Sequence, residues 1–169
     1  LLTATIAICT RDRATELQNC LEYVTQLEDR GQQILVIDNC PSNDATKTVV
    51  EKFEKVTYIR EDVPGLSHAR NRALVESQTD IVAFIDDDAV PDKGWLDAIL
   101  RNFDDPLVVC TTGLVMPLQL ETQTQQLFEK HVSLARGFKK KRYSRLNVSP
   151  AGVSMIGVGA NMALHRERF

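Results

Sequence analysis

Apolar positions along the chain follow two spacings that alternate from the N-terminus to about residue 115. Short runs of consecutive apolar or β-branched residues are typical of buried strands, whereas spacings of three and four residues indicate amphipathic helices. The strand-type runs cover residues 3–9, 34–37, 56–59, 81–85 and 107–115. The helix-type segments cover residues 14–27, 44–54, 66–76 and 95–103.

This alternation predicts one α/β domain, in which fully apolar strands form a parallel sheet with helices on both faces. Such sheets bind ligands outside the carboxyl ends of their strands. The loops expected to carry function are therefore residues 10–13, 38–44, 62–66 and 86–91. After residue 115 the alternation stops, and the pattern predicts a helix over residues 119–136 and a short strand over 162–164.

Composition narrows the class of protein. A length of 169 residues suits one domain, and a net charge of −3 argues against general affinity for nucleic acid. The four cysteines are far apart and show no metal-binding spacing, so we expect reduced thiols and a cytoplasmic setting. The chain starts without a methionine and ends at Phe169 without an evident stop, so we expect a piece of a longer polypeptide.

The acidic triplet Asp86-Asp87-Asp88 follows the apolar run of residues 81–85 directly. If strand geometry continues, Asp86 and Asp88 converge and Asp87 is turned aside, because side chains alternate along a strand. Two carboxylates about 6 Å apart repel by roughly 3 kcal/mol at an effective dielectric of 20. A hard divalent cation would relieve this repulsion. The alternative is a solvated acidic turn.

Four motifs in this order resemble the family 2 inverting glycosyltransferases. They are Thr10-Arg11-Asp12-Arg13, the segment 36–39, the segment 65–73, and the segment 84–91 followed by Trp95. The resemblance runs from Thr5 to Met162. It implies a single Rossmann-like, mostly parallel sheet of the A-type nucleotide-sugar fold, cut short at the C-terminus. Residues 1–115 would form the nucleotide-sugar-binding half, and residues 116–169 would begin an acceptor-side region.

The same resemblance implies roles for individual residues. The donor would be a UDP-, GDP- or dTDP-linked sugar, and Arg70 would reach its nucleotide or phosphates. Asp88, with Asp86, would hold Mn²⁺ or Mg²⁺. The residues implied to contact the nucleotide sugar are Thr10, Arg11, Asp38, Arg70, Asp86 and Asp87. From the residues alone, Asp38 could equally be a turn or cap residue, and Arg11 or Arg70 a plain surface residue.

Inverting transfer needs a general base for the acceptor hydroxyl, and the resemblance places it shortly after a segment like residues 157–162. No matching acid follows in this chain, so no general base is assigned, and the chain alone is expected to be weakly active or inactive. Gly159 and Asn161 would line the sugar or acceptor pocket, or serve close packing. The acceptor would be a glycan, a lipid or a polysaccharide of the cell envelope.

A basic run, residues 139–145, could approach the inner face of a membrane as a peripheral contact, or be a solvated loop. No apolar stretch approaches the ~20 residues that span a bilayer. The apolar face of residues 127–138 could likewise lie on lipid or on the sheet.

Two other functions fit less well, and a third stays open. A sugar-phosphate nucleotidyltransferase would have a glycine-rich phosphate loop after the first strand, and residues 10–14 contain no glycine. A receiver-like signalling module would have its acidic pair after the first strand, whereas the acidic triplet follows the fourth strand. A truncated fragment that binds donor without catalysis remains an alternative within the leading family.

Overall fold

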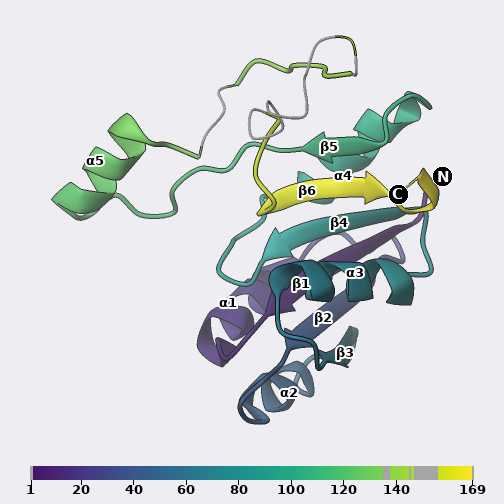
Figure 1. Cartoon of the computed structure of the whole chain (residues 1–169), viewed down its shortest axis with the longest axis vertical. Helices are drawn as coiled ribbons and strands as arrows, with labels where there is room; N and C mark the ends of the chain where they lie inside the picture. Colours follow the sequence, from purple (N-terminus) through teal and green to yellow (C-terminus); the bar gives the residue numbers. More distant parts are fainter. Residues whose placement is uncertain (1, 135–137, 145, 147–155, 169) are drawn as a thin grey trace.

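The computed structural model describes residues 2–134, 138–144, 146 and 156–168, which contain one six-stranded sheet and five α-helices (Figure 1). The strands are β1 (Ala4–Thr10), β2 (Gln33–Asn39), β3 (Val56–Glu61), β4 (Ile81–Asp86), β5 (Cys110–Thr112) and β6 (Asn161–His165). The helices are α1 (Ala14–Val24), α2 (Ala45–Val50), α3 (Leu66–Glu76), α4 (Trp95–Leu100) and α5 (Gln123–His131), with short 3₁₀ turns η1 (Arg101–Asp104) and η3 (Arg166–Arg168).

The strand order is β3-β2-β1-β4-β6-β5, and the first four strands of this order are mutually parallel. β6 is antiparallel to both of its neighbours, so the sheet is mostly parallel, as expected. The fifth strand differs from its prediction. It covers only Cys110–Thr112, pairs with β6, and lies at the sheet edge, separated from β4.

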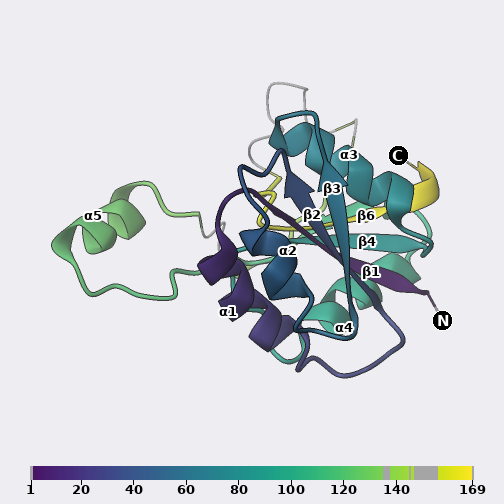
Figure 2. The same cartoon turned by 90° about the horizontal axis from the view of Figure 1, so that it is seen from below.

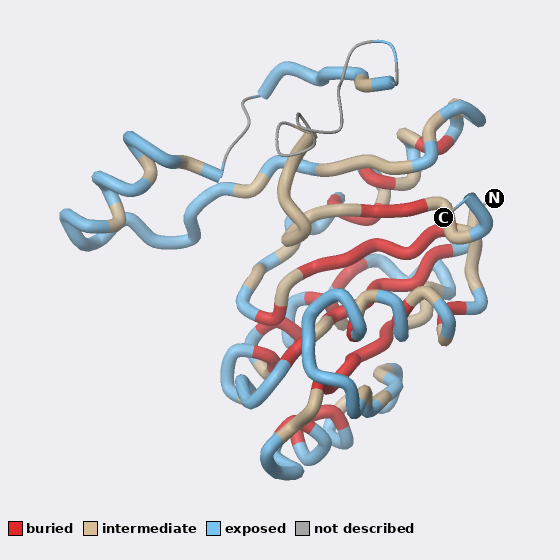
Figure 3. The backbone as a smooth tube through the Cα atoms, viewed as in Figure 1, coloured by how far each residue is buried: buried red, intermediate tan, exposed pale blue. Residues whose placement is uncertain are grey.

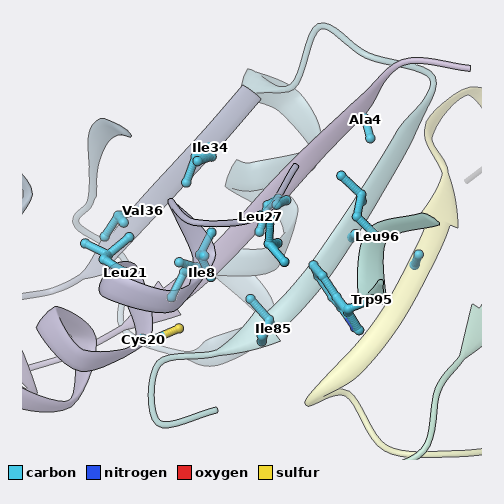
Figure 4. Packing of buried hydrophobic residues seen from close by; sticks show 14 of the residues in the cluster. Ala4, Ile8, Cys20, Leu21, Leu27, Ile34, Val36, Ile85, Trp95 and Leu96 are labelled. Carbon is cyan, nitrogen blue, oxygen red and sulfur yellow. The ribbon is translucent and has the colours of Figure 1, made fainter. Parts of the chain in front are cut away.

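Side-chain alternation along the strands divides the core between the two faces of the sheet. Ile6 and Ile8 of β1 pack in a cluster with α1, α2 and α4, whereas Ala7 packs with α3 on the opposite face. Figure 4 shows the first cluster, where Leu21 of α1 and Trp95 of α4 both lie over the strands. Figure 2 shows α3 on the other side of the sheet. Helices therefore cover both faces, as the alternating pattern predicts.

Residues 115–134 form an arm that carries α5 and stands away from the sheet in Figure 1 and Figure 2. α5 begins with a capping box between Thr122 and Gln125 and has no buried residue, so it does not lie on the sheet. Figure 3 shows the exposed arm beside the buried strands. Within the described ranges, no helix has the length and apolar character needed to cross a bilayer.

Candidate donor-binding site

Three predicted site residues, Thr10, Asp38 and Asp86, lie near the carboxyl ends of the neighbouring strands β1, β2 and β4. Thr10 is the register partner of Asp38 on β2, and Cys9 is the partner of Asp86 on β4. Thr10 therefore lies between Asp38 and the acidic triplet. The loops that sequence analysis singled out meet at one edge of the sheet, where ligands of parallel α/β sheets bind.

Strand alternation also decides which way each aspartate faces. Ile85 packs on the α1 side of the sheet, so Asp86 is directed to the α3 side and Asp87 to the α1 side. β4 ends at Asp86, and a turn follows in which the amide of Ala89 donates to the carbonyl of Asp86 at 3.1 Å. The predicted convergence of Asp86 and Asp88 required that strand geometry continue past Asp86. The turn ends that geometry, so the condition is not met. Asp88 is still close enough that its charge helps to raise the pKa of Asp86.

Asp87 is anchored in the protein and is not turned aside from Asp88, because both carboxylates pair with Arg13. Its side chain is 5% exposed, the Thr10 hydroxyl donates to Oδ2 at 2.6 Å, and Nη1 of Arg13 lies 2.9 Å from Oδ1. Burial raises the pKa of Asp87, while the Thr10 hydrogen bond and the Arg13 charge oppose the shift. Thr10 and Asp87 thus contact each other, and their predicted contacts with a nucleotide sugar stay predictions.

Arg13 is the site residue that sequence reasoning missed. It precedes α1, and its guanidinium joins Asp87 to Asp88, with Nη2 donating to Oδ2 of Asp88 at 2.8 Å. The hydrogen bond with Asp88 is the main cause of the raised pKa of Arg13. The sequence did contain a signal for this contact. Arg13 is a cation in the loop after β1, and that loop was expected at the same edge of the sheet as the acidic triplet.

Arg70 faces Asp86 from α3, where its Nη2 lies 4.0 Å from Oδ1 of Asp86. The guanidinium carbon lies 5.9 Å from the centre of the Phe84 ring. Burial raises the pKa of Asp86, and the Arg70 charge is the largest opposing effect. The backbone at Gly159 packs directly on the guanidinium, so a β-carbon at this position would overlap Arg70. Gly159 is therefore near a predicted phosphate contact.

Asp38 is completely buried at the end of β2. The Tyr58 hydroxyl donates to Oδ2 at 2.9 Å, while Oδ1 accepts no hydrogen bond of normal geometry from the described residues. Burial raises the pKa of Asp38, and the Tyr58 and Thr46 hydroxyls oppose that shift. Burial, together with Asp38, raises the pKa of Tyr58 to about 12. An unsatisfied buried oxygen beside a candidate ligand site is unusual for a plain turn residue.

Asn39 is a second residue that sequence reasoning did not single out for a role. Its Nδ2 donates to the carbonyl of Val63 at 2.7 Å, and its Oδ1 accepts from the amide of Gly65 at 2.7 Å. These bonds tie the end of β2 to the start of α3. Because α3 carries Arg70, Asn39 helps to set the position of that guanidinium.

Arg11 and Asn161 have different surroundings. Arg11 is about half exposed and pairs with Asp12 at 3.9 Å, and its contact with a nucleotide sugar stays a prediction. The Trp95 indole donates to Oδ1 of Asn161 at 3.0 Å, and Nδ2 of Asn161 donates to the carbonyl of Leu114 at 3.0 Å. The structure therefore gives Asn161 a packing role, and its place in a sugar or acceptor pocket stays a prediction.

The acidic triplet fits a cation that also has ligands from a substrate. Across the described residues, no three His, Cys, Asp or Glu side chains converge on a point that could hold a metal ion. Asp86 and Asp88 are partly exposed, at 46% and 54% of their side chains. Mg²⁺-type ions commonly use one or two carboxylates, several waters and substrate phosphates. Asp86 and Asp88 supply the one or two carboxylates that such an ion requires from the protein.

Comparison with known proteins identifies the family of this chain. A family model described as "Glycosyl transferase family 2" matches residues 5–169. A pre-mycofactocin glycosyltransferase of Mycobacterium tuberculosis is 32% identical over 117 residues, 68% of this chain and 24% of the relative. The putative glycosyltransferase EpsH of Bacillus subtilis is 28% identical over 152 residues, 78% of this chain and 44% of the relative. The chain thus spans less than half the length of these curated relatives.

Solved structures show the same fold. A mannosyltransferase of Pyrobaculum calidifontis, in complex with GDP-Man and Mn²⁺, superposes with a TM-score of 0.69 and 21% identity, covering 97% of this chain and 44% of the other. GalNAc-T7, in a structure with UDP, GalNAc and Mn²⁺, superposes with a TM-score of 0.59 and 17% identity, covering 66% of this chain and 23% of the other. At these identities the likeness establishes the A-type glycosyltransferase fold.

Proposed function

Because this chain belongs to glycosyl transferase family 2, we propose that it is the donor-binding part of a metal-dependent, inverting glycosyltransferase. The observation that carries the proposal is the position of the acidic triplet. It follows β4 at the carboxyl edge of the sheet, beside Thr10 of β1 and opposite Arg70 of α3. Carboxylates suited to a cation and a guanidinium suited to phosphate at one edge of the sheet support the proposal.

The proposed cofactor is Mn²⁺ or Mg²⁺, held by Asp88 together with Asp86. Their oxygens are hard ligands, and both side chains are accessible to a cation that also binds a diphosphate. The Pyrobaculum mannosyltransferase and GalNAc-T7 structures each contain Mn²⁺ with a nucleotide or nucleotide sugar, which supports this choice. When bound, the cation would stabilise negative charge on the departing nucleoside diphosphate.

The proposed donor is a nucleotide-diphosphate sugar linked to UDP, GDP or dTDP. Thr10 and Asp38 lie near the carboxyl ends of β1 and β2, Arg11 follows β1, and these three residues are proposed to contact the nucleoside. The unsatisfied Oδ1 of Asp38 is suited to accept a hydrogen bond. Arg70 would bind the phosphates, because its forked donors match phosphate geometry. Asp87 would act on the nucleotide indirectly, by holding Thr10 and Arg13.

In the proposed reaction, the acceptor hydroxyl attacks the anomeric carbon, and the nucleoside diphosphate leaves from the opposite face. A general base must take the hydroxyl proton. In this proposal the acidic triplet would lie on the leaving-group side, where Arg70, next to Asp86, would offset charge that develops on the phosphates. Among the described residues we assign no general base.

The proposed acceptor is a glycan or a lipid-linked molecule, with peripheral membrane contact through the arm of residues 115–134 and the basic run. The arm extends from the end of the sheet where β4 finishes (Figure 1). Leu127, Phe128 and Phe138 are exposed by 49%, 49% and 84%, close in sequence to the basic residues 139–142. Exposed apolar side chains together with cations are suited to contact anionic lipid. Arg145, part of the predicted basic run, lies outside the described residues.

Titration calorimetry with UDP-, GDP- and dTDP-linked sugars, with and without Mn²⁺, tests the proposal. We expect cation-dependent binding of one donor class by the wild-type chain and loss of that dependence in Asp88→Ala. Asp104→Ala is the matched control, because this exposed carboxylate on η1 carries the same charge change away from the site. Equal donor binding by Asp88→Ala and the control would remove the acidic triplet from the mechanism.

A further inference from the structure

Arg13 joins two parts of the chain that are 75 residues apart. It precedes α1, whereas Asp87 and Asp88 form the turn after β4. One guanidinium nitrogen lies 2.9 Å from Oδ1 of Asp87, and the other donates to Oδ2 of Asp88 at 2.8 Å. The guanidinium therefore bridges two consecutive carboxylates that would otherwise repel each other.

The two halves of this bridge differ in exposure. Asp87 is 5% exposed and also accepts the Thr10 hydrogen bond, so Arg13 and Asp87 form a fixed anchor. Asp88 is 54% exposed, and the structure gives it no second ion pair among the described residues. Exposed ion pairs are weak because water competes for both partners. Asp88 can therefore leave Arg13 at small cost, whereas Asp87 stays.

We propose that Arg13 is a positioning residue of the donor site, whose guanidinium competes with the divalent cation for Asp88. The inference rests on the proposed function, because it takes Asp88 as a cation ligand. Without the cation, Arg13 holds the acidic turn together. When a cation binds, Asp88 exchanges the guanidinium for the metal, and Arg13 remains on Asp87.

The charges around the acidic triplet predict whether loss of Arg13 strengthens or weakens cation binding. Arg13 and Arg70 face three carboxylates, so loss of the Arg13 charge leaves the site more negative and more attractive to a cation. Loss of the guanidinium also frees Oδ2 of Asp88. Both effects tighten cation binding in the absence of nucleotide. A purely structural role for Arg13 would instead loosen the turn and weaken cation binding.

Mn²⁺ titration followed by electron paramagnetic resonance tests this inference at pH 8 without nucleotide. We expect Arg13→Gln to bind Mn²⁺ about three- to tenfold more tightly than wild type, which is a modest electrostatic effect. Arg13→Lys should lie between the two, because an ammonium keeps the charge but cannot bridge both carboxylates in the same way. Arg72→Gln is the matched control, since Arg72 on α3 pairs with Glu76 and leaves the acidic turn untouched.

Equal or weaker Mn²⁺ affinity in Arg13→Gln, with a native circular dichroism spectrum, would overturn the inference. If Arg13→Gln does not fold, Arg13→Lys decides, and wild-type or weaker affinity in that variant overturns it. Asp88→Ala distinguishes a failure of the proposed cation site from a failure of the role of Arg13. If this variant binds Mn²⁺ as wild type does, the proposed function fails. If it loses Mn²⁺ but the Arg13 variants gain nothing, only the role of Arg13 fails.

Discussion

The Thr10 hydroxyl donates a 2.6 Å hydrogen bond to Oδ2 of Asp87, so the last residue of β1 is tied to the turn after β4. Both residues are buried, at 4% exposure each. A charged acceptor deprived of its donor in such a place costs free energy, because water cannot replace the lost partner. This one bond joins two loops that the proposed donor must contact together.

Thr10→Val is therefore expected to destabilise the fold. The isosteric change leaves Oδ2 of Asp87 without its hydroxyl donor, which costs about 1.5–3 kcal/mol of unfolding free energy. Thr10→Ser keeps the hydroxyl and should lose less. Urea denaturation followed by fluorescence measures both variants, and equal stability of wild type and Thr10→Val would contradict the importance of the bond.

Gly159→Ala is expected to act on Arg70 and leave the fold nearly intact. The new β-carbon would overlap the end of a flexible side chain, which can move aside, so the unfolding free energy should change by less than about 1 kcal/mol. Donor affinity should fall several-fold, because the guanidinium is displaced from Asp86. Gly94→Ala is the control, since its nearest non-neighbouring atom, Oδ1 of Asp92, is at an ordinary 3.5 Å.

A double-mutant cycle with Arg70→Gln checks this mechanism. If Gly159 acts through Arg70, the double variant should bind donor no more weakly than Arg70→Gln alone. Additive losses would show that Gly159 has a separate contact with the donor or acceptor.

Asn161→Ala is expected to reduce stability more than donor affinity. The change removes the acceptor for the Trp95 indole and the donor to the Leu114 carbonyl, which together cost about 1–3 kcal/mol. Thermal unfolding and calorimetry, on the same preparation, separate the two effects. Unchanged stability with weakened ligand binding would favour the predicted place of Asn161 in the sugar or acceptor pocket.

Asp38 should make stability depend on pH. Its folded-state pKa is raised by burial, so the folded state holds its proton to a higher pH than the unfolded state does. Stability from this group is thus present below its unfolded pKa of about 3.9 and is lost as pH rises through the higher folded pKa. We expect the stability of Asp38→Asn relative to wild type to increase from pH 4 to pH 7. Urea titrations at both pH values, with Asp62→Asn as an exposed control, give the comparison, and a constant difference would contradict it.

Vesicle binding tests the proposed membrane contact. We expect the chain to sediment with vesicles that contain anionic phospholipid and not with neutral vesicles, in a salt-dependent way. Replacement of Lys139, Lys140 and Lys141 by Gln should remove this binding. Each cation near an anionic surface contributes roughly 1 kcal/mol. If the triple variant sediments with anionic vesicles as the wild type does, the basic run is a solvated loop that does not bind the membrane.

The sequence by itself determined the α/β alternation and the loops that gather at one edge, and it placed the C-terminal ends of the four parallel strands within two residues. These features depend on local rules, since apolar runs specify strands and alternate residues share a face. The triplet could be recognised as a candidate site because its chemistry is visible without any contact map.

Only the tertiary structure decided which partners these residues have. Arg13 meets Asp87 and Asp88, and Gly159 packs on Arg70, across separations of at least 74 residues. The same holds for β6, which inserts between β4 and β5 and leaves β5 as a short edge strand. Periodicity carries no information on sheet order or on contacts between distant segments, because those depend on how whole elements pack.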